Sequence, residues 1–230
     1  MRGSLIVFGA LMVLVLLLIA LPIIDKSINL SPYWGVLSLA IVSLAVLAMF
    51  FEFGEGRTSK EITLTAMLGA LSAMIRVPFG AIPSLQPSTF IIASTGYVFG
   101  PVSGFMVGAL TALVSNFFLG TGPWTLYQML AWGLVGMFFA LLGKLKMPKW
   151  SLAGFGLLWG YVFGFVMNLW YLTAFGFPIT LKSVIALQAA SFWMDTLHGV
   201  GTFVFFLVFG KRVIAILERF KQRFLGQTVK

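Results

Sequence analysis

Long uninterrupted apolar runs decide what this 230-residue chain can fold into. The runs at residues 5–24, 33–51, 102–119 and 124–142 each approach the length of about 20 residues that a helix needs to cross a bilayer. Backbone groups in hydrocarbon have no water to bond, so a spanning segment must be a helix or a strand of a closed barrel. Because these runs are continuous and do not alternate over short segments, they indicate helices.

The charged side chains are too few for a soluble domain of this size. Only 9% of the residues are charged, against about 25% in an average soluble protein, so lipid must be part of the solvent. The net charge of +9 does not indicate nucleic acid, because the positive side chains sit between and after the apolar runs, where they orient membrane proteins. The absence of cysteine excludes thiolate metal sites, and one histidine with one embedded acid is too little for zinc. We therefore expect neither a metal nor another cofactor.

The predicted fold class is an all-α membrane protein of about eight transmembrane helices. Residues 1–56 would form an N-terminal helix pair with its loop, residues 57–212 a six-helix core, and residues 213–230 a basic cytoplasmic tail, interpreted as a short surface helix. A cleaved signal peptide is the alternative for the first run, but no small-x-small cleavage site follows it. The predicted spans are 5–24, 33–51, 62–77, 88–99, 102–119, 124–142, 150–175 and 183–209, with a polar loop at 52–60.

The distribution of lysine and arginine predicts the orientation. An even number of spans places both termini on one side of the membrane. The loops on the opposite side carry Lys26 and Lys182, and Arg76 sits near the outer end of its span. By the positive-inside rule the chain is a multi-pass protein of the cell membrane with both termini in the cytoplasm. The basic residues on the terminal side are Arg2, Arg57, Lys60, Lys144, Lys146, Lys149, Lys211, Arg212, Arg219, Lys221, Arg223 and Lys230.

Polar side chains inside a bilayer are costly, so each needs a partner or a purpose. Asp195 and His198 are three residues apart and share one face of the last helix, where they can contact a ligand, relay protons or lock helices together. Arg76 can reach the outer surface, or point inward toward Asp195 or an anionic ligand. The outer loops are rich in proline and glycine and almost uncharged, which predicts an outward-facing pocket. Further candidate substrate-binding residues, which can equally be interhelical contacts or interfacial anchors, are Gln86, Asn116, Trp124, Gln128, Asn168 and Trp170.

Small residues at helical spacing mark faces where helix backbones can approach closely. Ala66, Ala70 and Ala73 form such a face on the third predicted helix. Glycines repeat the pattern between residues 100 and 108 and between residues 156 and 164. Each face can pack within the bundle or dock another membrane subunit.

Three stretches together resemble a known family. They are Ala66-Met-Leu-Gly-Ala70, the segment 122–133 (Gly-Pro-Trp-Thr-Leu-Tyr-Gln-Met-Leu-Ala-Trp-Gly), and Asp195-Thr-Leu-His198-Gly-Val-Gly. With the six-helix core, they make residues 60–212 look like the substrate-binding (S) component of energy-coupling factor (ECF) vitamin transporters. The segment 122–133 looks like a stretch common in one branch of this family. That branch resembles proteins linked to cobalamin or its precursors.

The resemblance implies a binding protein and not an enzyme. It would bind a vitamin or related micronutrient from outside, dock through Ala66, Ala70 and Ala73 onto a membrane scaffold subunit, and depend on two cytosolic ATPases. No Walker A motif is present, which agrees with energy supplied by another subunit. The alternatives are a self-sufficient secondary transporter or channel, and an intramembrane enzyme that uses Asp195 and His198 as an acid–base pair.

Overall fold

The regular structure is helical throughout the part of the chain that the computed structural model describes, residues 3–25, 27 and 31–226. Eight α-helices and one short 3₁₀ turn follow one another there, which confirms the predicted all-α class. Six of the helices are long and apolar enough to cross a membrane, and a shorter apolar stretch, Gly3–Leu18, lies in the first. The elements are α1 (Gly3–Ile24), η1 (Ser31–Tyr33), α2 (Trp34–Gly54), α3 (Ser59–Phe79), α4 (Pro87–Phe99), α5 (Pro101–Leu119), α6 (Trp124–Lys144), α7 (Lys149–Ala174) and α8 (Leu181–Leu225).

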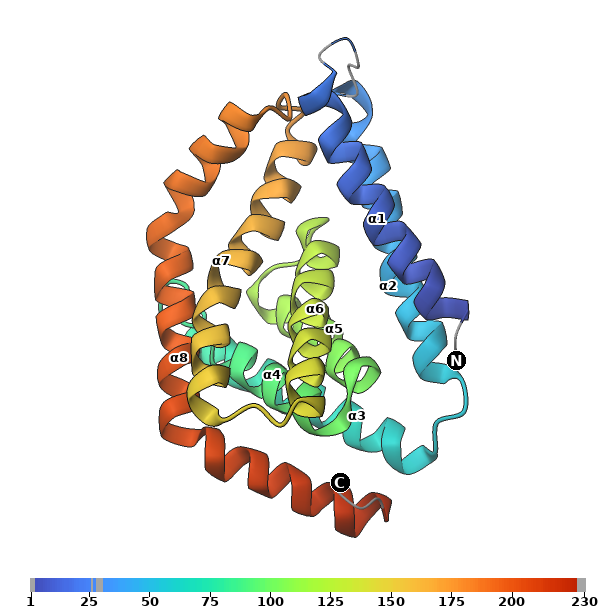
Figure 1. The fold of residues 1–230 in the computed structure, drawn as a ribbon, viewed down its shortest axis with the longest axis vertical. Helices are drawn as coiled ribbons and strands as arrows, with labels where there is room; N and C mark the ends of the chain where they lie inside the picture. The colour runs from blue at the N-terminus through green and yellow to red at the C-terminus, as the bar shows by residue number, and fades with distance from the viewer. Residues whose placement is uncertain (1–2, 26, 28–30, 227–230) are drawn as a thin grey trace.

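The N-terminal helix pair packs along one side of the remaining helices (Figure 1). α1 packs against α2, and α2 also contacts α5, α6 and α7. The ends of α2 and α6 lie at the same end of the molecule as the end of α8, whereas α1 and α7 end at the opposite end (Figure 1). Of the basic residues used to predict the orientation, Arg2, Lys26 and Lys230 lie outside the described residues.

The polar stretch 52–60 is shorter as a loop than the sequence suggests. Glu52 belongs to α2 and is only 2% exposed, so the helix continues past the point where its sequence turns polar. α3 begins with a capping box, because Thr58 Oγ1 accepts a hydrogen bond from the Glu61 backbone N–H while the Glu61 carboxylate accepts one from the Thr58 N–H.

α4 is a short helix inside the bundle. Its 13 residues span about 20 Å, less than the roughly 30 Å of hydrocarbon in a bilayer. Ten of these residues are buried. Gly100 at φ 95° and Pro101 then turn the chain directly into α5.

The glycine faces pack within the bundle. A Cβ on Gly104 of α5 would lie 2.7 Å from the Gly96 Cα of α4 and 2.8 Å from the Gly136 carbonyl oxygen of α6, so only glycine lets these backbones cross. Gly160 of α7 meets the backbone of α8 at Gly199 in the same way. These faces are therefore occupied by helices of the same chain.

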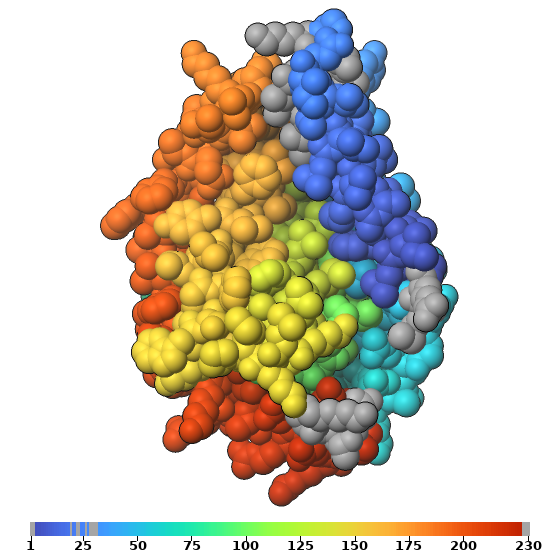
Figure 2. Space-filling model, in the orientation of Figure 1, coloured from blue at the N-terminus to red at the C-terminus, as the bar shows by residue number. Residues whose placement is uncertain are grey.

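α8 continues beyond the predicted end of its span. The span predicted at 183–209 and the surface helix predicted for the tail are parts of one continuous helix, Leu181–Leu225. It turns sharply, and its last part, residues 211–225, lies across the end of the bundle (Figures 1 and 2). We call residues 211–225 the tail segment. The ammonium group of Lys221 donates a hydrogen bond of 2.7 Å to the Val98 carbonyl oxygen and so holds the tail segment against the end of α4.

Candidate functional site

A cavity of about 220 Å³ lies between the second half of α7 and the first half of α8, next to the segment that precedes α4. Polar side chains from all three elements face it. The lining residues are Ser84, Gln86, Phe163, Gly164, Met167, Asn168, Ser191, Met194, Asp195 and His198.

Asp195 is held at the cavity by neutral hydrogen-bond donors alone. Its Oδ2 accepts hydrogen bonds from Gln188 Nε2 (2.7 Å) and Ser191 Oγ (2.8 Å). Asn168 of α7 closes the network by donating its Nδ2 protons to Gln188 Oε1 (3.2 Å) and Ser191 Oγ (2.9 Å). Among the described residues no cation pairs with Asp195, and its Oδ1 receives no hydrogen bond. Oδ1 is therefore free to accept a hydrogen bond from a molecule in the cavity.

His198 is tied to the interior of the bundle and not to Asp195. Its Nε2 lies 2.7 Å from Thr89 Oγ1 of α4, and the Trp132 indole Nε1–H donates to the same hydroxyl at 2.9 Å. The hydroxyl satisfies both contacts when it accepts from Trp132 and donates to Nε2. The proton of the neutral imidazole then sits on Nδ1. Phe163 packs edge-on against the ring at a centroid distance of 4.9 Å.

Arg76 points inward, to a second polar network. Its Nη1 donates to Ser115 Oγ and, at 2.6 Å, to Asn116 Oδ1. Asn116 Nδ2 in turn donates to Thr125 Oγ1 (2.9 Å) and Gln128 Oε1 (2.8 Å). Arg76 is 6% exposed, and within the described part of the chain no carboxylate pairs with it. Of the two predicted orientations, the inward one is present, but the partner is not Asp195.

Trp132 joins the contacts of His198 to the Arg76 network. The Arg76 guanidinium lies over its ring, 4.7 Å from the centroid, while its indole N–H reaches Thr89 and through it His198. The side chains from His198 to Gln128 are thus connected through Thr89, Trp132, Arg76 and Asn116. The hydrogen bonds of Asp195 form a separate group, which meets this network only where His198 and Asp195 line the same cavity.

The structure brings together only part of the predicted site. Gln86, Asn168, Asp195 and His198 line the cavity. Arg76, Asn116 and Gln128 belong to the second network and do not line it. Trp124 and Trp170 pack edge to face on each other at 5.8 Å, also away from the lining residues.

Sequence reasoning missed several residues that shape the site. Gln188 and Ser191 precede Asp195 by seven and four positions, so helical spacing alone places them on its face. Thr89 and Trp132 meet His198 only through the tertiary fold, and no local pattern indicates that meeting.

The small residues of α3 divide between two faces. Ala66 and Ala70 are exposed, beside the exposed Met67. Ala73 is 1% exposed and lies inside the bundle. The prediction that it shares a docking face with Ala66 and Ala70 is therefore wrong.

These features define a multi-pass membrane protein with a polar cavity in its interior. Residues 60–217 match the family described as ECF transporter, substrate-specific component, and because this match covers more than half of the chain, the chain belongs to that family. The predicted family resemblance is thereby confirmed. A UPF0397 protein of Vibrio atlanticus is 29% identical over 149 residues, which cover 56% of this chain and 81% of that protein.

The other similar proteins match over shorter regions. UPF0397 proteins of Aliivibrio fischeri and Aliivibrio salmonicida are each 32% identical over 89 residues. Each of those matches covers 36% of this chain and 48% of the relative. No solved structure matches the chain.

Proposed function

We propose that this substrate-specific subunit of an ECF importer binds a small water-soluble micronutrient of the vitamin class from outside the cell. The observation that carries the proposal is the convergence of Gln86, Asn168 and Asp195 on one cavity in an apolar bundle. Such groups are expensive in a membrane unless they bind something or each other. The Asp195 Oδ1 and the buried Gln86 Oε1 have no hydrogen-bond partner among the described residues, which leaves two acceptors for a ligand.

The charge at the cavity favours a substrate with hydrogen-bond donors or a positive charge. Asp195 is bound only by neutral donors, so a donor or cation on the substrate would complete its coordination. Arg76 holds its charge away from the cavity and is proposed to position Trp132, not to contact the substrate directly.

The size of the cavity favours a small vitamin over a corrinoid. Its volume of about 220 Å³ is below the roughly 300–1,000 Å³ of typical ligand pockets, whereas cobalamin is far larger than a drug-sized molecule. The predicted link to cobalamin or its precursors would need a much wider opening between α7, α8 and the segment before α4. Our proposal is therefore a substrate about the size of a single heterocyclic vitamin.

We further propose that Ala66 and Ala70 dock a membrane scaffold subunit, which couples the chain to two cytosolic ATPases. Both alanines are exposed on α3, and small residues one turn apart let a partner helix approach closely. The basic loops and the tail segment would face the cytoplasm, with both termini on that side. The division into a helix pair (1–56), a core (57–212) and a tail (213–230) is part of this proposal.

The test is ligand binding by the purified chain. A panel of small vitamins and cobalamin would be titrated calorimetrically against the wild-type chain and Asp195→Asn, with mass spectrometry of any co-purified molecule. Asparagine keeps an acceptor for Gln188 and Ser191 but removes the charge, so binding should weaken about 10- to 150-fold while the unliganded protein stays as heat-stable as wild type. A loss of heat stability with unchanged affinity would show that Asp195 only locks helices.

The alternatives make different predictions for the same protein. A secondary transporter would accumulate substrate in vesicles under an ion gradient without ATPase subunits. An enzyme would convert a substrate, and Asp195→Asn would stop turnover but keep binding. Tight binding without either activity supports the proposal.

A further inference from the structure

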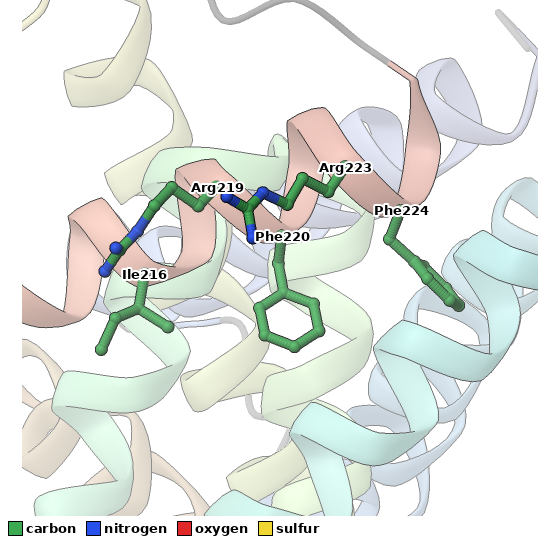
Figure 3. Close-up of a pocket in the computed structure, with 5 residues that line it drawn as sticks. All are labelled: Ile216, Arg219, Phe220, Arg223 and Phe224. Carbon is green, nitrogen blue, oxygen red and sulfur yellow. The ribbon is translucent and has the colours of Figure 1, made fainter.

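The tail segment carries an exposed apolar ridge. Ile216, Phe220 and Phe224 follow one another at four-residue intervals, so they lie along one side of the helix. They are 40%, 51% and 37% exposed, although Leu217 beside them is buried. Figure 3 shows the three side chains leaving the same side of the helix. Contacts within the bundle therefore leave much of the surface of this ridge uncovered.

A line of arginines borders the ridge. Arg212, Arg219 and Arg223 are spaced by seven and four residues, which places them on one line of the helix surface. Arg219 and Arg223 run along the helix axis next to the ridge (Figure 3). With Ile216, Phe220 and Phe224 they line a groove of about 380 Å³. In the described part of the chain neither arginine pairs with a carboxylate.

The position of the groove limits what can occupy it. The tail segment lies across the end of the bundle, at the same end as the basic loop between α6 and α7 (Figures 1 and 2). Five of its residues are basic and only Glu218 is acidic. A basic helix with an apolar face at the rim of a membrane bundle matches anionic lipid in both charge and polarity.

We propose that the tail segment binds an anionic glycerophospholipid of the adjacent leaflet. The phosphate sits at Arg219 and Arg223, and an acyl chain covers Ile216, Phe220 and Phe224. The lipid completes the docking of the tail segment, which the Lys221 hydrogen bond to Val98 begins. Lys60, 5.6 Å from the Phe224 ring centroid, places the end of this groove beside the start of α3.

The test uses the full chain in nanodiscs of phosphatidylcholine with phosphatidylglycerol, and native mass spectrometry of the lipids that stay bound. Wild type should prefer phosphatidylglycerol, and Arg219→Gln with Arg223→Gln should weaken that preference about 10- to 30-fold. The matched control is Lys144→Gln with Lys146→Gln, which removes two charges at the same end but lies outside the groove. This control should stay within about twofold of wild type.

A second measurement does not depend on charge. Because the chain has no cysteine, Phe220→Cys can carry a single nitroxide label. Its collisions should favour oxygen over a water-soluble nickel chelate, whereas a label at the exposed Gln222→Cys should favour the chelate.

Several outcomes would overturn the lipid site. Equal losses in the two double variants would indicate a diffuse positive field. Displacement of phosphatidylglycerol by inorganic phosphate would indicate a free-anion site. If the arginine variant no longer captures the scaffold subunit but keeps its preference for phosphatidylglycerol in the nanodiscs, the surface binds a protein. A label at position 220 that favours the chelate would place the ridge in water.

Discussion

Gly164 of α7 sets the position of the Asp195 carboxylate, and replacing it with alanine should weaken both the fold and substrate binding. A Cβ at position 164 would overlap Asp195 Oδ1, Cγ and Oδ2. The carboxylate must then rotate away or α7 and α8 must move apart. Rotation would break the hydrogen bonds from Gln188 and Ser191. At about 1.5–3 kcal/mol each, their loss would lower the free energy of unfolding by about 3–6 kcal/mol. The better helix propensity of alanine returns about 1 kcal/mol, so we expect a net loss of about 2–5 kcal/mol.

The effect on substrate binding should be large for the same reason. A displaced carboxylate no longer presents Oδ1 to the cavity, and losing one charge-assisted hydrogen bond of about 1.5–3 kcal/mol weakens Kd about 10- to 150-fold. Calorimetric titration and thermal unfolding in detergent measure the two effects. Gly154→Ala is the matched control, since a Cβ on that glycine of α7 meets nothing within 4 Å. If Gly164→Ala binds substrate like Gly154→Ala, then Asp195 does not contact substrate where we place it.

Three further predictions test other parts of the structure. Ala66→Trp or Ala70→Trp should abolish capture of the scaffold subunit in a co-purification assay while leaving substrate affinity unchanged, because both residues lie on the exposed face of α3; assembly that survives both changes would remove this docking surface. Thr89→Val should lower thermal stability by about 2–4 kcal/mol, because it leaves His198 Nε2 and the Trp132 N–H unpaired, whereas Thr89→Ser should stay near wild type. Gly104→Ala should cost about 1–3 kcal/mol or more in the same unfolding assay, because its Cβ meets backbone atoms of two helices; a wild-type melting temperature would contradict that crossing.

The sequence predicts the helices well because hydrocarbon imposes a length and a polarity that can be counted. The Gly100-Pro101 turn and the Thr58 cap are local features, so their positions follow from the residues alone. The errors occur where the change from apolar to polar residues does not coincide with the end of a helix. Glu52 and Lys211 mark a change of polarity, but backbone hydrogen bonding continues through both.

The site was only partly predictable because its contacts join distant segments. Asp195 and His198 share a helix face, which their spacing shows, yet the structure sends them to different partners. Thr89 and His198 are 109 positions apart, and no pattern in either segment indicates their contact. Arg76 could be placed inward or outward from the sequence, and only the packing around Ser115 decides between them.

The buried charges of Arg76 and Asp195 argue for a binding function more strongly than any single contact does. Arg76 and Asp195 have opposite signs, and pairing them would offset part of their desolvation cost. The fold instead gives each its own set of neutral partners, and neutral hydrogen bonds do not cancel a buried charge. A protein selected only for stability would replace both residues or join them. Their separation fits a function in which Asp195 binds a substrate group and Arg76 fixes Trp132 beside the cavity. The unliganded state then carries a desolvation cost that the substrate relieves.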